Sequence, residues 1–98
     1  MPGRVIILMG SKSDLEHVNK ITAQLDKFGI AHVVRVASAH KSVRYLLGVL
    51  ESYDQAGEAT VYIAVAGRSN ALAGMVDANT TWPVITCPPT SSAFGGAD

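Results

Sequence analysis

An unbroken run of five apolar residues, Val5 to Met9, lies near the start of this 98-residue chain and ends at Gly10. A run of this kind suits a strand that is covered on both faces, as in the middle of a parallel sheet. Five apolar residues then recur at spacings of three and four, which lays one stripe along a helix. Asp14 can cap the start of this helix and Gly29 its end. The stripe consists of Leu15, Val18, Ile21, Leu25 and Phe28.

The same alternation of strand and helix continues along the chain. Residues 30–36 form a strand that is more polar than the first, which predicts an edge position. Three strand-to-helix alternations predict one α/β domain over residues 1–98, a three-layer Rossmann or flavodoxin-like fold with a mostly parallel sheet. The remaining elements are a helix between Ser42 and Gly57, a strand over 61–66, a short helix through Leu72, Met75 and Val76, and a strand over 84–87 stopped by Pro88 and Pro89.

Length and charge exclude several classes of protein. Ninety-eight residues allow one domain, and eight basic against eight acidic residues give a formal net charge of zero. With no run of like charge, a general nucleic-acid binder is excluded. No apolar stretch approaches the roughly 20 residues of a membrane span, and a signal-peptide pattern is missing. The single cysteine, Cys87, can form no internal disulfide. We therefore expect a cytoplasmic protein without a nucleic-acid or membrane partner.

Charged residues make up only 16% of the chain, against about 25% in an average protein. This shortage of charge predicts that part of the surface is covered by something other than water.

Loops that follow parallel strands lie along one edge of the sheet, where such folds bind ligands at the point of strand-order reversal. The first loop, Gly10 to Asp14, joins a glycine, the hydroxyls of Ser11 and Ser13 and the amides of a helix N-terminus, which together suit one phosphate. It lacks the ending of a P-loop and the glycines of a dinucleotide fingerprint. Asp14 suits sugar hydroxyls, since a phosphate repels a carboxylate. The alternative is that Ser13 and Asp14 only cap the helix.

The second and third of these loops add polar and titratable groups. In the segment from Ser38 to Lys41, His40 is suited to exchange protons near neutral pH, and Lys41 supplies a point charge for an anion. The third loop, Ala66 to Asn70, begins with a small pair that lets a ligand approach the backbone and continues with three polar side chains. A surface histidine and a helix-capping turn are the simpler alternatives for these two loops.

Three further candidates have structural interpretations. Cys87 ends an apolar strand, which favours a buried, inert thiol over a nucleophile. His17 and His32 fall in a helix and a strand, and we expect both to be structural or exposed. The spacing of the three histidines matches no metal motif, so no metal site is expected.

Four segments together resemble the phosphoribosylaminoimidazole carboxylase family of purine biosynthesis, often called PurE. They occur in the family's order and separation across nearly the whole chain. Family members continue for roughly another half-length beyond this point, so the resemblance implies that residues 1–98 are the N-terminal portion of the family domain. The segments are Met9-Gly10-Ser11-Lys12-Ser13-Asp14, Ser38-Ala39-His40-Lys41, Ala64-Val65-Ala66-Gly67-Arg68-Ser69-Asn70 and Pro83-Val84-Ile85-Thr86-Cys87-Pro88-Pro89.

The resemblance also separates two branches of the family. The branch common in bacteria rearranges N5-carboxyaminoimidazole ribonucleotide and typically has arginine after the loop histidine and a Gly-Gly-Ala-Ala-His string after the third strand. Here Lys41 follows His40, and Arg68, Ser69 and Asn70 follow Gly67. This pattern looks like the second branch, class II, which adds CO2 directly and reversibly to aminoimidazole ribonucleotide without ATP.

The resemblance implies a role for each matching position. His40 would move a proton at the imidazole carbon that gains or loses the carboxylate. Gly10, Ser11, Ser13 and Asp14 would bind the ribose phosphate, with Asp14 on the sugar hydroxyls. Ser38, Ala39 and Lys41 would complete the ribonucleotide contacts, and Ala66, Gly67, Arg68, Ser69 and Asn70 would surround the base and the CO2.

The expected partners are the substrate and product ribonucleotides and CO2, with no cofactor, in a homo-oligomer of four or eight subunits. Two alternatives stay open: the N5-carboxyaminoimidazole ribonucleotide mutase reaction of the first branch, and a ribonucleotide-binding fragment without catalysis.

Overall fold

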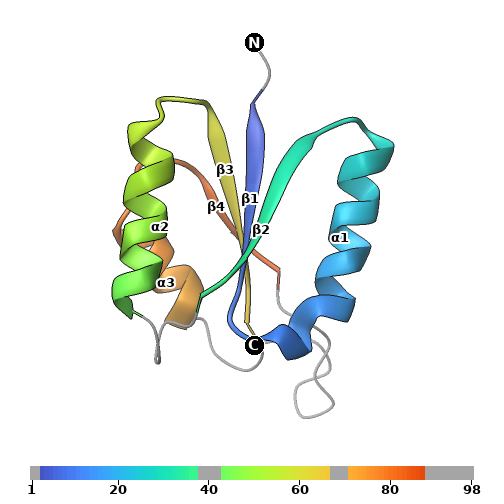
Figure 1. Ribbon diagram of the computed structural model, residues 1–98, viewed down its shortest axis with the longest axis horizontal. Helices are drawn as coiled ribbons and strands as arrows, with labels where there is room; N and C mark the ends of the chain where they lie inside the picture. Colours follow the sequence, from blue (N-terminus) through green and yellow to red (C-terminus); the bar gives the residue numbers. More distant parts are fainter. Residues whose placement is uncertain (1–2, 38–42, 67–70, 88–98) are drawn as a thin grey trace.

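A computed structural model of the chain describes residues 3–37, 43–66 and 71–87. Strands and helices alternate through these residues as the sequence predicts, and helices flank the sheet on both sides (Figure 1). The elements are β1 (Arg4–Met9), the 3-10 helix η1 (Lys12–Asp14), α1 (Leu15–Lys27), β2 (Ala31–Val36), α2 (Val43–Gln55), β3 (Thr60–Val65), α3 (Ala71–Ala78) and β4 (Val84–Thr86).

The four strands form one sheet in the order β2-β1-β3-β4, and every neighbouring pair is parallel. Met9 at the end of β1 is level with Val36 of β2 and Val65 of β3. The edge position predicted for β2 is confirmed. Since β2 lies on one side of β1 while β3 and β4 lie on the other, the strand order reverses between β1 and β3.

The central strand β1 is buried on both faces, as its unbroken apolar run predicts. Ile6 and Leu8 face α2 and α3 and pack in one cluster with side chains such as Leu46. Ile7 and Met9 face α1 and pack with Val18. None of these side chains is more than 4% exposed. A helix on each face of a parallel sheet is the arrangement that three-layer α/β folds require, and the predicted fold class is confirmed.

The ends of α1 agree only in part with the sequence analysis. At its C-terminus Gly29 has φ +68°, and its amide donates to the Asp26 carbonyl at 3.1 Å. The next amide, that of Ile30, donates to the Leu25 carbonyl at 2.9 Å, and the two bonds make a Schellman motif. At the N-terminus, Asp14 makes no side-chain capping bond. It sits at φ −85° and ψ 0° because η1 runs directly into α1, so the predicted Asp14 cap is wrong.

A polar cluster ties the amino half of β3 to its neighbours. The Tyr62 hydroxyl donates to Asp54 Oδ1 at 2.9 Å, and Thr80 Oγ1 donates to the same oxygen at 3.0 Å. Burial, followed by the hydrogen bond to Asp54, raises the pKa of the Tyr62 phenol well above its usual range. Nearby, the Arg4 guanidinium lies 4.8 Å from the ring centre of Tyr53. These bonds connect α2, β3 and the segment before β4.

Within the described residues, no helix has the length and apolar character needed to cross a membrane.

Candidate functional site at the carboxyl edge of the sheet

The point of strand-order reversal brings together two small residues that the sequence predicts for the site. The Gly10 amide donates to the Val65 carbonyl at 2.9 Å, which holds the end of β1 beside the end of β3. A Cβ atom built on Gly10 would lie 3.6 Å from the Ala66 Cβ. With hydrogen in that place, Gly10 carries no side chain that would keep a flat or linear ligand away from its backbone. The structure thus joins the first and third candidate loops at the expected switch point.

The first loop has its own hydrogen-bonded order. Ser11 is extended, with φ −154° and ψ 150°, and its Oγ accepts hydrogen bonds from the Ser13 amide at 3.2 Å and the Ser13 hydroxyl at 3.0 Å. Ser11 therefore makes the capping bond, at the start of η1, that the alternative interpretation gave to Ser13 and Asp14. Both hydroxyls are exposed, and Asp14 is partly exposed.

This arrangement suits a phosphorylated sugar. The hydroxyls of Ser11 and Ser13 lie together at the beginning of η1, and η1 continues into the 13-residue helix α1. A helix N-terminus and adjacent hydroxyls favour an anion. Because the Asp14 carboxylate is not used as a helix cap, its oxygens are available as hydrogen-bond acceptors.

The other predicted site residues lie outside the described part of the chain: Ser38, Ala39, His40, Lys41, Gly67, Arg68, Ser69 and Asn70. The residue that leads into the second loop is described. Ala37 is buried, and its amide donates to the Met9 carbonyl at 2.8 Å. Ala37 therefore lies at the same edge as Gly10 and Ala66, as parallel strand order requires.

Cys87 differs from its sequence-based prediction. Strand β4 ends at Thr86, and Cys87 beyond it is half-buried where a fully buried thiol was expected. Its Sγ lies 3.8 Å from Nε2 of His17, which belongs to the first turn of α1. The reason is that β4 is poorly covered on the α1 face, where Ile85 is 52% exposed. Sequence reasoning missed the pair because 70 residues separate its members.

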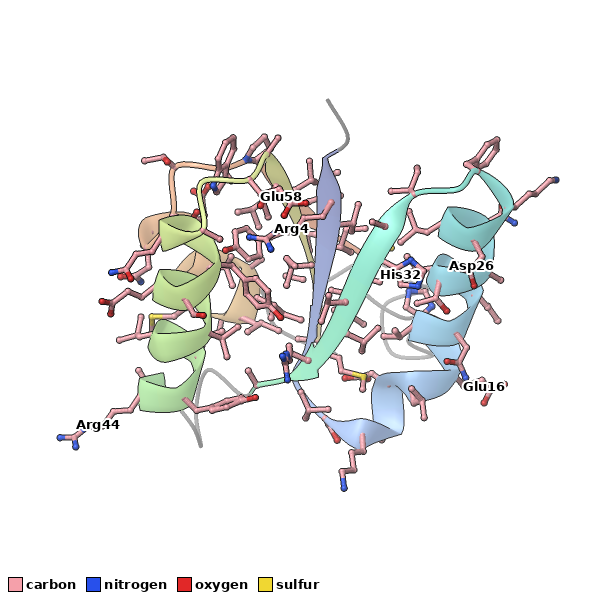
Figure 2. All side chains as sticks on the ribbon, turned by 45° about the horizontal axis from the view of Figure 1, so that its top comes forward. Arg4, Glu16, Asp26, His32, Arg44 and Glu58 are labelled. Atoms are coloured by element: carbon pink, nitrogen blue, oxygen red, sulfur yellow. The ribbon has the colours of Figure 1, made fainter. Side chains whose placement is uncertain are left out.

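His32 lies away from these residues and has local partners. Its Nδ1 is 3.0 Å from the Ile30 carbonyl, and its Nε2 is 3.7 Å from Asp26 Oδ1 (Figure 2). The structural role expected for His32 is confirmed. In the ranges that the structure covers, no group of three or more His, Cys, Asp or Glu side chains is arranged to hold a metal ion.

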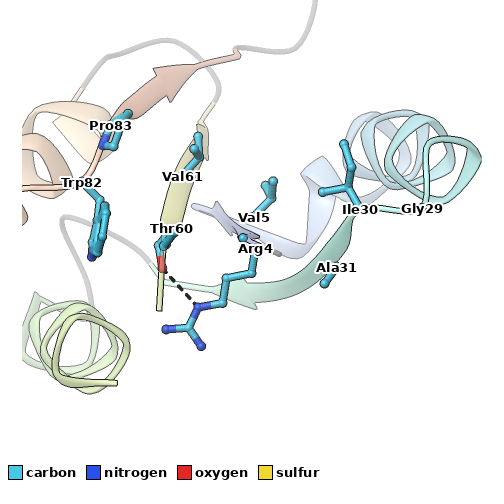
Figure 3. A pocket seen from close by; sticks show the side chains of 11 residues that line it. Arg4, Val5, Gly29, Ile30, Ala31, Thr60, Val61, Trp82 and Pro83 are labelled. Atoms are coloured by element: carbon cyan, nitrogen blue, oxygen red, sulfur yellow. Dashed lines mark hydrogen bonds between the residues drawn. The ribbon is translucent and has the colours of Figure 1, made fainter. Parts of the chain in front are cut away.

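A hollow of about 580 Å³ opens at the opposite edge of the sheet, where the strands begin (Figure 3). Its lining includes Val5, Ile30, Val61, Trp82 and Pro83. At its rim Arg4 Nε donates to Thr60 Oγ1 at 3.1 Å. No predicted site residue belongs to it, and its mostly apolar wall offers few groups for a phosphorylated ligand. The carboxyl edge is therefore the better candidate for the functional site.

The parallel strand order and the helices on both faces of the sheet define a flavodoxin-like α/β protein. Residues 4–98 match the family model described as AIR carboxylase. The chain belongs to this family, and the resemblance carried by the four sequence segments is confirmed.

Individual relatives agree with this assignment. Phosphoribosylaminoimidazole carboxylase of Archaeoglobus fulgidus is 53% identical over 97% of this chain and 52% of its own length. The rat bifunctional phosphoribosylaminoimidazole carboxylase/phosphoribosylaminoimidazole succinocarboxamide synthetase is 46% identical over 97% of this chain and 22% of its own. The crystal structure of Treponema denticola PurE superposes with a TM-score of 0.92 and 45% identity, covering 96% of this chain and 60% of that one. The chain thus spans about half the length of the single-function carboxylase.

Proposed function

We propose that this protein carboxylates 5-aminoimidazole ribonucleotide with CO2, reversibly and without ATP, to give 4-carboxy-5-aminoimidazole ribonucleotide in purine biosynthesis. The observation that carries the proposal is the family match over residues 4–98, together with the meeting of Gly10 and Ala66 at the switch point. The relatives named phosphoribosylaminoimidazole carboxylase support the choice of reaction.

The described residues account for the sugar phosphate. The Ser11 hydroxyl donates to the phosphate at the helix N-terminus, the Ser13 hydroxyl exchanges its bond to Ser11 for one to the phosphate, and Asp14 accepts from the ribose hydroxyls. Ser38, Ala39 and Lys41 complete these contacts in the proposal, with Lys41 as a point charge.

The proposed chemistry takes place at a ring carbon. Aminoimidazole is an enamine-like ring whose carbon attacks CO2, so the enzyme has to orient the two reactants and exclude water. His40 then removes the proton from that carbon, and returns it in the reverse direction. Small residues such as Gly10 and Ala66 suit a linear, apolar CO2 molecule, and Gly67, Arg68, Ser69 and Asn70 surround the base and the new carboxylate.

The class II branch is proposed on the residues that differ between the branches. Lys41 stands after His40, and Arg68-Ser69-Asn70 follow Gly67. The rat bifunctional relative, whose name includes the carboxylase, supports this choice. We place the enzyme in the cytoplasm as a homo-oligomer of four or eight subunits.

The proton-transfer role is tested by His40→Ala. Loss of the base should lower kcat for decarboxylation of the carboxylated ribonucleotide by about a hundredfold or more, while ribonucleotide binding persists. His32→Ala is the matched control and should retain turnover, because the polar partners of His32, Asp26 and Ile30, lie near the amino end of β2, away from the proposed site. Turnover is followed by ultraviolet absorbance and binding by calorimetry. Full turnover in His40→Ala would refute the assigned role, and binding without turnover in the unaltered protein would favour the non-catalytic alternative.

The carbon source is tested separately. Supplied with aminoimidazole ribonucleotide, the enzyme should incorporate labelled carbon from bicarbonate or CO2 without ATP. Given N5-carboxyaminoimidazole ribonucleotide in CO2-free buffer, it should form little product. Rapid conversion of that compound would instead assign the mutase reaction.

A further inference from the structure

We propose that Cys87 and His17 form a reactive thiol site that takes small, soft carbon electrophiles. The two side chains come from elements far apart in the sequence, and the fold places Cys87 Sγ 3.8 Å from His17 Nε2. This distance is within the range for a hydrogen bond to sulfur. The inference does not depend on the carboxylase reaction, which uses neither residue.

The backbone holds both members of the pair in place. The Cys87 amide donates to the Ala64 carbonyl at 3.0 Å, which extends the β3-β4 pairing by one residue. His17 lies in the first turn of α1, a helix fixed at its far end by the Schellman motif at Gly29. Two rigid elements therefore set the distance between the thiol and the imidazole, and little side-chain ordering is needed to bring them together.

The surroundings make His17 the acceptor for the thiol proton. The cluster that Cys87 packs against is apolar, with Ile7, Met9, Val18 and Val65 at its centre. An imidazole beside a thiol can take up the thiol proton and then pair with the thiolate. Cys87 has the His17 ring as such a neighbour, whereas a thiol surrounded by apolar side chains alone has none.

The site is half-buried, so it admits small reagents better than large ones. In the proposed step the Sγ proton passes to His17 Nε2. The sulfur lone pair then forms a bond to the electrophilic carbon, and the leaving group departs with its electron pair. With iodoacetamide the products are a thioether on Cys87, iodide and a protonated His17.

The test measures the alkylation rate of the intact protein by mass spectrometry under pseudo-first-order iodoacetamide at pH 7. The chain has one cysteine, so each added carbamidomethyl group reports Cys87. We expect the native protein to react faster than the same protein unfolded in urea, and His17→Gln to lower the native rate about fivefold or more. His32→Gln is the matched control and should react like the unaltered protein, while Cys87→Ser should add no label.

In urea, all variants that contain Cys87 should be alkylated at the same rate. Equal rates there show that differences between the native proteins come from the folded pair and not from the reagent. Circular dichroism identifies a His17→Gln variant that has failed to fold, and His17→Phe then provides a second replacement that cannot accept the thiol proton. A native rate below the unfolded rate, or an equal native rate in folded His17→Gln, would overturn the proposal. Neither result bears on the carboxylase assignment, which is tested at His40.

Discussion

The backbone conformation of two residues decides how the first loop can be used. Ser11 is extended and caps η1 through its side chain, whereas Asp14 has near-helical angles and makes no capping bond. A cap residue needs a non-helical conformation for its side chain to reach the amides ahead of it. Asp14 consequently keeps its carboxylate oxygens for a ligand, and the proposed contact with ribose hydroxyls depends on this difference.

A substitution of the single residue Gly10 gives a first prediction. A methyl group at this position would lie 3.6 Å from the Ala66 Cβ, an ordinary contact, and Gly10 does not have a positive φ. Gly10→Ala should therefore change the free energy of unfolding by less than about 1 kcal/mol. It should raise KM for the ribonucleotide about tenfold, because the methyl group occupies the space beside the backbone that a ligand would use.

Gly48→Ala is the matched control for this substitution. Gly48 is exposed within α2, and a Cβ there would meet nothing within 4 Å, so KM should stay unchanged. Steady-state kinetics and thermal unfolding measure the two effects independently. An unaltered KM in a folded Gly10→Ala variant would remove Gly10 from the proposed site.

Among the elements, α1 shows how a helix end is determined locally. Gly29 ends α1 in the left-handed region, and its amide and that of Ile30 bond back to the last turn. No side chain stands within 4 Å of a Cβ built on Gly29, so a substitution would be opposed by the backbone alone. Gly48, in the middle of α2, is the contrasting case, because a helix interior disfavours glycine.

The two glycines should therefore respond to alanine with opposite signs. Gly29→Ala should destabilise the fold by about 1 to 2 kcal/mol, since φ +68° is unfavourable for a residue with a Cβ. Gly48→Ala should stabilise it by about 0.5 to 1 kcal/mol. Urea denaturation of both variants measures the changes in the free energy of unfolding. Destabilisation of similar size in both would contradict the role of the positive φ.

Across the whole molecule, the two faces of the sheet are covered unequally. Among residues 3–37, 43–66 and 71–87, helices α2 and α3 cover one face of the sheet and α1 is the one helix on the other (Figure 1). On the latter side Ile85 is 52% exposed, and Phe28 at the end of α1 is 69% exposed. These apolar side chains agree with the low charge of the sequence, which predicts that part of the surface is covered by something other than water.

The exposed apolar side chains support the proposed homo-oligomer. Light scattering and sedimentation at micromolar concentration should give a particle of four or eight subunits, since association removes exposed apolar surface from water. If the contacts between subunits are weak, dilution should lower the mass of the particle reversibly. A particle with the mass of a single chain over the whole concentration range would contradict this prediction.

Sequence reasoning recovered the order and type of every described strand and α-helix, and missed the 3-10 helix η1. It placed β2 at an edge because its side chains are mixed, and it predicted Gly29 as the end of α1 because glycine suits a left-handed residue. It erred at Asp14, since a propensity for caps does not reveal a preceding 3-10 turn. It also erred at Cys87, whose exposure depends on how far α1 extends over β4.

The sequence by itself determined the alternation of elements, the two-sided burial of β1 and the loops that carry candidate chemistry, because these follow from local periodicity and residue type. Only the tertiary structure decided which distant residues meet. Strand order brought Gly10 beside Ala66, and the placement of α1 brought His17 to Cys87. Such contacts depend on how helices pack across the sheet and on which strands become neighbours, and neither is encoded in the spacing of residues along a single element.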